Sequence, residues 1–116
     1  MNDITTEADV EQLVQAFYAR AIKDEQIGHF FEHTDFVKHL PRMYAFWNFI
    51  LLGKEGYKGS VLEKHLHMAL TKRDFERWVF LFTETILANY AGETADMAIQ
   101  RAQTMAWTFA TKFPEQ

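Results

Sequence analysis

The chain has 116 residues, a formal net charge of −4 and no cysteine. Its length suits a single domain spanning residues 1–116, and its 48% of hydrophobic residues is enough for a buried core. The acidic balance argues against nucleic acid or an anionic membrane surface as the main partner, and the lack of cysteine excludes disulfides, iron–sulfur clusters and thiol catalysis.

The first predicted helix covers roughly residues 7–23. Thr6 and Asp9 have the spacing of a capping box, and apolar residues follow at helical intervals. A short helical turn is expected over residues 25–31, where aromatic residues and a histidine occur together.

A second long helix is expected around Pro41, because the first turn of a helix tolerates a residue without a backbone N–H. His39 would then lie at the entrance of this helix or in its first turn. From Met43 onward, apolar residues recur at i, i+3, i+4, i+7 and i+8, and Gly53 and Gly56 are expected to end the helix.

The rest of the chain predicts a loop over residues 53–59, a short helix over residues 60–67 and then two long antiparallel helices. Thr71 and Asp74 form a second capping-box pair, and the last helix begins after Gly92. No segment shows the alternation of a β-strand, so the expected fold class is all-α with five or six helices.

Two histidines suggest a haem pocket. His39 shares a helical face with Met43 and Phe46, and His65 precedes a long aromatic-rich helix. A helical protein that holds haem iron uses one neutral imidazole beside apolar walls. Haem b would bind non-covalently, because the chain has no C-x-x-C-H sequence. Taken singly, each histidine is explained more simply as a surface residue or a hydrogen-bonded core residue.

A zinc site is an alternative for one part of the chain. His29, Glu32 and His33 match the inverted H-x-x-E-H pattern of zinc proteases. Two histidines at i and i+4 can share a zinc ion, but a catalytic site needs a third ligand and a substrate cleft. The short helix and the short chain count against this interpretation.

Several short motifs follow one another in a specific order: Phe17-Tyr18, Phe31, His39-Leu-Pro-Arg-Met-Tyr-Ala-Phe-Trp47, Leu51-Leu-Gly-Lys-Glu-Gly-Tyr-Lys-Gly59, Lys64-His65, and Phe75-Glu-Arg-Trp78 with Leu81-Phe82. In this order and spacing, which cover nearly the whole chain, they resemble the group III truncated haemoglobins. The resemblance implies an all-α, truncated globin-like two-over-two helical sandwich.

The resemblance also implies roles for single residues. His65 would be the proximal iron ligand, Tyr18 and Trp78 would donate hydrogen bonds to a bound gas, and His39 would be the distal or gate histidine. His67 is an alternative iron ligand, and His39 could itself bind iron in a six-coordinate resting state. The other candidate haem contacts are Phe31, Met43, Phe46, Trp47, Tyr57, Lys64, Phe75, Phe82 and Met105.

Basic residues are candidates for the haem propionates, because charged hydrogen bonds to carboxylates are strong. One or two members of the set Arg42, Lys64, Arg73 and Arg77 are expected to serve, and Tyr57 offers a hydroxyl for the same purpose. Phe109, Phe113 and Met97 are expected to be plain core residues.

The expected function is binding of O2, carbon monoxide, nitric oxide or similar small ligands at a histidine-ligated iron. Two or three donors around one ligand would slow its release, which suits nitric oxide dioxygenation or peroxidase-like turnover better than oxygen transport in bulk. Enzymatic activity is left open, and turnover would need an electron donor such as a reductase. Alternatives are a non-catalytic gas or haem sensor, an O2 store, or a haem-free helical domain.

A cytoplasmic protein is expected, since the sequence shows neither a signal peptide nor a membrane span.

Overall fold

The structure, a computed structural model, describes residues 1–57 and 68–112, and every regular element within them is a helix. These elements are α1 (Glu7–Ala21), the 3-10 helix η1 (Gly28–Phe31), α2 (Phe36–Leu52), α4 (Lys72–Asn89) and α5 (Glu93–Lys112). The described part of the chain contains no strand, in agreement with the all-α prediction. The short helix expected over residues 60–67 lies outside the described residues.

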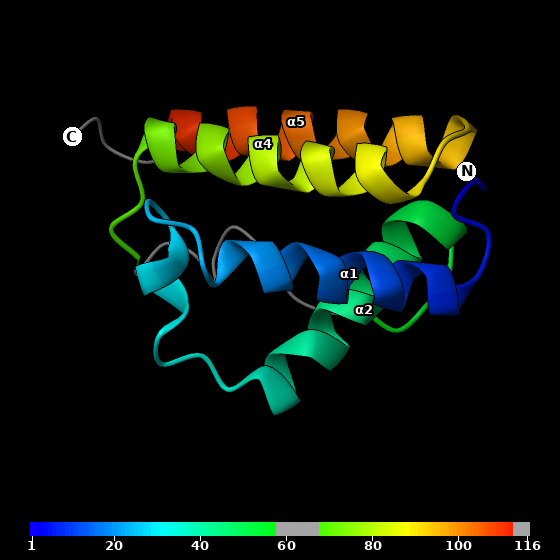
Figure 1. The fold of residues 1–116 in the computed structure, drawn as a ribbon, viewed down its shortest axis with the longest axis horizontal. Coiled ribbons are helices and arrows are strands. Elements are labelled where there is room, and N and C mark those ends of the chain that lie inside the picture. Colours follow the sequence, from blue (N-terminus) through cyan, green and yellow to red (C-terminus); the bar gives the residue numbers. More distant parts are fainter. Residues whose placement is uncertain (58–67, 113–116) are drawn as a thin grey trace.

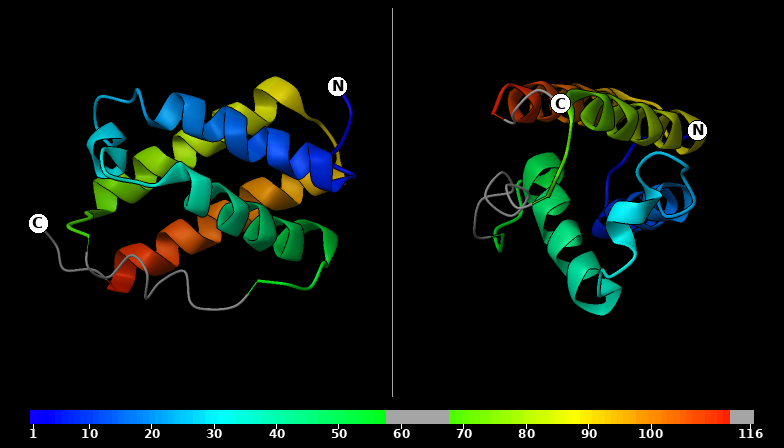
Figure 2. Two further views of the ribbon diagram at one scale, coloured as in Figure 1. Left: turned by 90° about the horizontal axis from the view of Figure 1, so that it is seen from below. Right: turned by 90° about the vertical axis from the view of Figure 1, so that its left-hand side faces the viewer.

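The four α-helices form two layers. α4 and α5 run antiparallel in one layer, and α1 and α2 lie together in the other (Figure 1). The right-hand view of Figure 2 separates the two layers, and Figure 1 shows η1 at one end of the layer formed by α1 and α2. The face of α5 toward the core carries small side chains, which lets α4 approach closely: Ala95, Ala98, Ala102 and Ala106.

Both predicted capping boxes are confirmed. The Asp9 N–H donates to the Thr6 hydroxyl, and the Thr6 N–H donates to the Asp9 carboxylate, each at 3.1 Å. At the start of α4, the Asp74 N–H donates to the Thr71 hydroxyl at 3.2 Å, and the Thr71 N–H donates to the Asp74 carboxylate at 3.0 Å. Each box satisfies backbone donors that a helix start leaves without partners, so the two helices begin where the sequence predicted.

α2 begins earlier than predicted. Its N-cap is Asp35, whose carboxylate accepts from the Val37 N–H at 3.1 Å, so His39 is the fourth helical residue and remains in the first turn. The prediction that Pro41 lies in the first turn is wrong, because Pro41 is inside the helix. The proline removes one backbone hydrogen bond there. The cap and the buried second half of the helix keep the helix continuous up to Gly53, which ends it with φ of 66°.

The N-terminal segment closes on the start of α5. The Asp3 carboxylate accepts from the N–H groups of Thr94 and Ala95 at 2.9 and 2.8 Å. Gly92 has φ of 139°, and a Cβ there would lie 2.5 Å from the Asp3 side chain. Ile4, only 1% exposed, is buried beside this contact. Asp3 therefore caps the start of α5 from a position 91 residues earlier in the chain.

Candidate functional site

A cavity of about 1080 Å³ opens between the two layers. Protein interiors are close-packed and leave few voids larger than a water molecule, so a space of this size marks a ligand site. Apolar and aromatic side chains make most of its wall. They come from α1, η1, α2, α4, α5 and the segments on either side of residues 58–67.

The structure brings together most of the site residues predicted from the sequence. The ones that line the cavity are Tyr18, Phe31, His39, Met43, Phe46, Trp47, Tyr57, Phe75, Trp78 and Met105. Phe82 does not line it and instead lies behind the wall, only 1% exposed. Lys64, His65 and the alternative ligand His67 lie outside the described residues.

A tyrosine and a histidine form the main polar contact of the wall. The Tyr18 hydroxyl, on α1, lies 2.7 Å from Nε2 of His39 in the first turn of α2. Burial raises the pKa of Tyr18 above its ordinary value of 10, so the hydroxyl keeps its proton. The direction of the hydrogen bond follows the tautomer of His39.

Aromatic rings fix the direction of the Tyr18 side chain. Phe31 and Phe36 each pack edge-to-face against the Tyr18 ring, with centroids 5.5 Å apart. Phe36 also contacts the His39 ring at 5.9 Å. Phe36 is not among the residues predicted from the sequence, although its place three residues before His39 puts it on the same face of the helix.

The indole of Trp78 is held from behind by other rings. It stacks on Phe82 with centroids 5.4 Å apart and planes 7° apart, and Phe82 stacks in turn on Trp47 at 4.8 Å. Phe17 meets Trp78 edge-on at 5.8 Å. Phe82 thus supports two residues of the wall without reaching the cavity.

Another part of the wall suits an anionic group. The buried Tyr57 hydroxyl has no hydrogen-bond partner among the described residues. Burial raises the pKa of Tyr57, and the nearby positive charge of Arg42 opposes that rise. Both residues line the cavity. A hydroxyl and a guanidinium that line the same cavity are donors that a carboxylate prefers.

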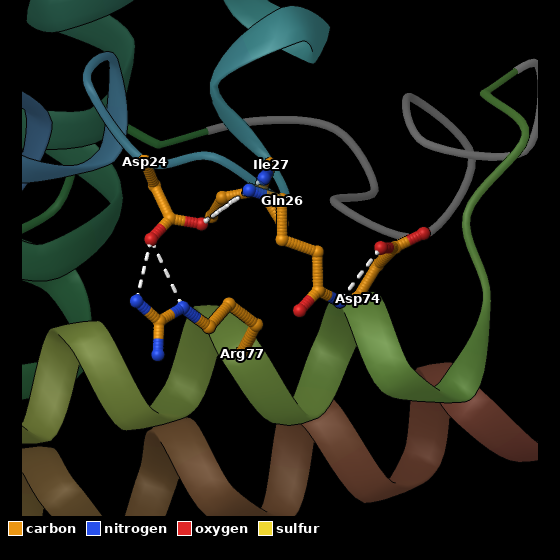
Figure 3. A network of polar contacts seen from close by, with 5 residues as sticks. All are labelled: Asp24, Gln26, Ile27, Asp74 and Arg77. Carbon is orange, nitrogen blue, oxygen red and sulfur yellow. Dashed lines mark hydrogen bonds and ion pairs between the residues drawn. The ribbon is translucent and has the colours of Figure 1, made fainter.

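An ion pair anchors the chain after α1 to α4 (Figure 3). Arg77 Nη2 and Nε lie 2.7 and 2.9 Å from Asp24 Oδ1, and the N–H groups of Gln26 and Ile27 donate to Asp24 Oδ2 at 3.1 Å each. Gln26 also donates to Asp74 at 3.0 Å. Hydrogen bonding to Arg77 lowers the pKa of Asp24, against a rise from burial. The network fixes Ile27 and Asp74, which line the cavity.

Two of the predicted propionate ligands lie elsewhere. Arg77 is paired with Asp24, and neither Arg77 nor Arg73 lines the cavity. Arg42 is the arginine of the predicted set that does. Phe109, expected in the core, also lines the cavity and packs edge-on against Phe75 at 5.8 Å.

The zinc alternative gains no support from the arrangement of its residues. His29 is exposed, and its ring packs on Phe30 with centroids 4.1 Å apart. Over residues 1–57 and 68–112, no group of three histidine, cysteine, aspartate or glutamate residues is arranged to hold a metal ion.

The sequence of residues 2–111 matches the bacterial-like globin family. It is also 31% identical over 107 residues to the group 3 truncated hemoglobin ctb of Campylobacter jejuni, a match that covers 86% of this chain and 84% of the relative. The chain belongs to the group III truncated haemoglobins. This confirms the family predicted from the motifs.

Solved structures confirm the two-over-two fold of this truncated haemoglobin. The crystal structure of the group III protein from Campylobacter jejuni superposes with a TM-score of 0.88 at 30% identity, covering 98% of this chain and 96% of that one. The 2/2 hemoglobin of Synechococcus, solved in the cyanomet state with covalently attached heme, shares the fold with a TM-score of 0.80 at 19% identity, over 94% of each chain.

Globins bind haem, and the cavity of this truncated haemoglobin fits that group. Its rings offer faces for a flat apolar macrocycle. The Tyr57 hydroxyl, which finds no hydrogen-bond partner among the described residues, and the Arg42 guanidinium both suit a carboxylate. Tyr18 and His39 supply a polar pair within an otherwise apolar wall. No helix within the described ranges is long and apolar enough to cross a membrane.

Proposed function

We propose that this truncated haemoglobin holds haem b without a covalent bond and binds O2, carbon monoxide or nitric oxide beside Tyr18. The observation that supports the proposal is the hydrogen bond of 2.7 Å between Tyr18 and His39 at the wall of a large apolar cavity. When bound, haem supplies an iron with a position open to a small ligand and a capacity for one-electron chemistry.

Tyr18 is the main hydrogen-bond donor in this proposal. Its raised pKa keeps the hydroxyl protonated, and the packing of Phe31 and Phe36 limits where it can point. When Nε2 of His39 carries a proton and donates to the Tyr18 oxygen, the Tyr18 O–H is left to donate to the ligand. The apolar wall excludes water, which strengthens that bond.

Trp78 is the second proposed donor. Its ring lies at the cavity wall and is fixed by the stack with Phe82 and Trp47. Donors on rigid side chains lose little conformational freedom when a ligand arrives. Two fixed donors favour slow release of O2, which suits nitric oxide dioxygenation or peroxidase-like turnover with electrons from a reductase. The cytoplasmic location expected from the sequence stays a prediction.

His65 is proposed as the iron ligand, with His67 as the alternative. Arg42, Tyr57 and Lys64 are proposed to bind the propionates. For Arg42 and Tyr57 the reason is that both line the cavity. The covalent attachment described for the Synechococcus protein is not proposed for this chain.

Titration of the purified protein with haem tests the assignment of the ligand. His65→Gly is expected to lose tight binding, and added imidazole is expected to restore the spectrum of the wild-type protein. His67→Gly is the matched control and is expected to bind haem as the wild type does. Loss of tight haem binding in His67→Gly, with normal binding in His65→Gly, would identify His67 as the iron ligand.

The proposed chemistry is tested by mixing the oxygenated protein with nitric oxide. Stoichiometric nitrate is the expected product. Release of oxygen without formation of nitrate would instead indicate that the protein is a gas sensor or an O2 store.

A further inference from the structure

One face of α2 combines exposed apolar and basic side chains. Val37 is 85% exposed and Phe49 is 51% exposed, although both are large hydrophobic residues. At 100° per residue they share one face of the helix with a set of neighbours. We call this face the α2 stripe: Val37, Lys38, Pro41, Arg42, Ala45 and Phe49.

The α2 stripe is positively charged in an acidic protein. The 17 residues of α2 contain no aspartate or glutamate, and their two formal charges, Lys38 and Arg42, both lie on the stripe. The chain as a whole carries −4. The nearest acidic residues along the chain are Asp35, whose carboxylate caps the helix, and Glu55 beyond its end. The stripe therefore differs in sign from the rest of the molecule.

The same helix forms a wall of the candidate haem site. Pro41, Arg42 and Ala45 belong to the stripe and also line the cavity. A protein that docks on the stripe would therefore lie directly beside the cavity, at the edge that these three residues form. From Val37 to Phe49 the stripe extends for roughly 18 Å, which suits the small interfaces of transient redox encounters.

We propose that the α2 stripe is the docking surface for an acidic electron-carrier protein with a flavin or iron–sulfur centre. This rests on the proposed function, in which the iron must be reduced. One electron leaves the carrier, which is oxidised by one electron, and the ferric iron becomes ferrous; no bond and no proton is exchanged. Lys38, which is exposed and does not line the cavity, attracts the acidic partner, and Val37 and Phe49 supply the apolar contact.

The test uses the haem-loaded protein and an acidic plant-type [2Fe–2S] ferredoxin as the probe. Stopped-flow absorbance gives the second-order rate constant for reduction of the ferric protein by reduced ferredoxin. Lys38→Glu is expected to lower this constant at low ionic strength by roughly tenfold or more, and the difference should shrink as salt is added. Val37→Ser should lower it at every salt concentration.

Arg101→Glu is the matched control, because it makes the same change in net charge at an exposed position on α5. It is expected to have a much smaller effect than Lys38→Glu. Reduction by dithionite, which needs no docking surface, should be the same in all variants. Calorimetric titration with oxidised ferredoxin should show the same order of affinities.

Equal effects of Lys38→Glu and Arg101→Glu, or no binding of ferredoxin to the wild-type protein, would overturn the docking proposal. In both cases, normal haem binding and normal reduction by dithionite would leave the proposed function intact. A protein that takes up no haem would instead remove the proposed function on which the docking surface rests.

Discussion

Tyr18 and His39 lie on different helices, 21 residues apart, yet the hydroxyl of one is 2.7 Å from Nε2 of the other. The bond links α1 to the first turn of α2 at the cavity wall. The same Tyr18 hydroxyl is therefore available to His39 or to a ligand, and the position and tautomer of His39 decide between them.

Tyr18→Phe should speed the release of O2. A hydrogen bond to a charged acceptor contributes about 1.5–3 kcal/mol, which corresponds to roughly ten- to a hundredfold in the dissociation rate constant. Stopped-flow displacement of O2 by carbon monoxide measures this constant. Tyr44→Phe is the control, because the Tyr44 hydroxyl accepts from Gln15 on the surface and does not line the cavity. An unchanged rate in Tyr18→Phe would remove Tyr18 from its role.

His39→Ala should speed the association of carbon monoxide. If the bond to Tyr18 holds His39 across the path of the ligand, its loss removes about 1 kcal/mol from the entry barrier, roughly a fivefold increase. Flash photolysis gives the association rate constant. Lys38→Ala, at the neighbouring exposed position, should leave it unchanged. Equal rates in His39→Ala and the wild type would contradict the gate.

Local signals predicted the helices well, and their failures have local causes. The Thr6 and Thr71 capping boxes lie within three residues of their partners, so sequence spacing alone reveals them. The start of α2 was misplaced because Pro41 fits a first turn by its own chemistry, whereas the cap at Asp35 decides where the helix begins.

Most residues that line the cavity could be predicted from the sequence, but the contacts that support these residues could not. The apolar spacing and the family motifs selected ten residues that line the cavity. They did not show that Phe82 would stand behind Trp78 or that Arg77 would pair with Asp24, because both depend on how the helices pack. The cap that Asp3 gives to α5 joins residues more than 90 positions apart, where no local pattern exists.

Asp24→Asn should destabilise the protein at neutral pH. The side chain of Asp24 is 5% exposed, and its folded-state pKa lies below 3.8, first because of its hydrogen bonds with Arg77. Its contribution is therefore fully present above pH 3.8 and is lost as the pH falls through the lower, folded-state pKa. Thermal unfolding should show a melting temperature several degrees below wild type at pH 7, and the two should converge in acid. Asp96→Asn, at an exposed position, should change it much less. A gap that persists in strong acid would contradict the ion-pair account.

Asp3→Ala should destabilise the fold by about 0.5–2 kcal/mol, the usual cost of losing a helix cap. The Asp3 carboxylate satisfies the N–H groups of Thr94 and Ala95, which the first turn of α5 leaves without helical partners. Urea unfolding gives the free energy. Glu93→Ala, also in that turn but exposed, is the control and should cost less. If both variants cost the same, charge near the helix end rather than capping would explain the effect.

The most direct test of the central claim is the visible absorption spectrum of the purified protein in its ferric, dithionite-reduced and carbon monoxide-bound states. The account predicts a Soret band and a five-coordinate ferrous form that converts fully on addition of carbon monoxide, because the cavity beside Tyr18 and His39 leaves a position open to the ligand. A protein that stays colourless after haem is supplied would contradict the haem site.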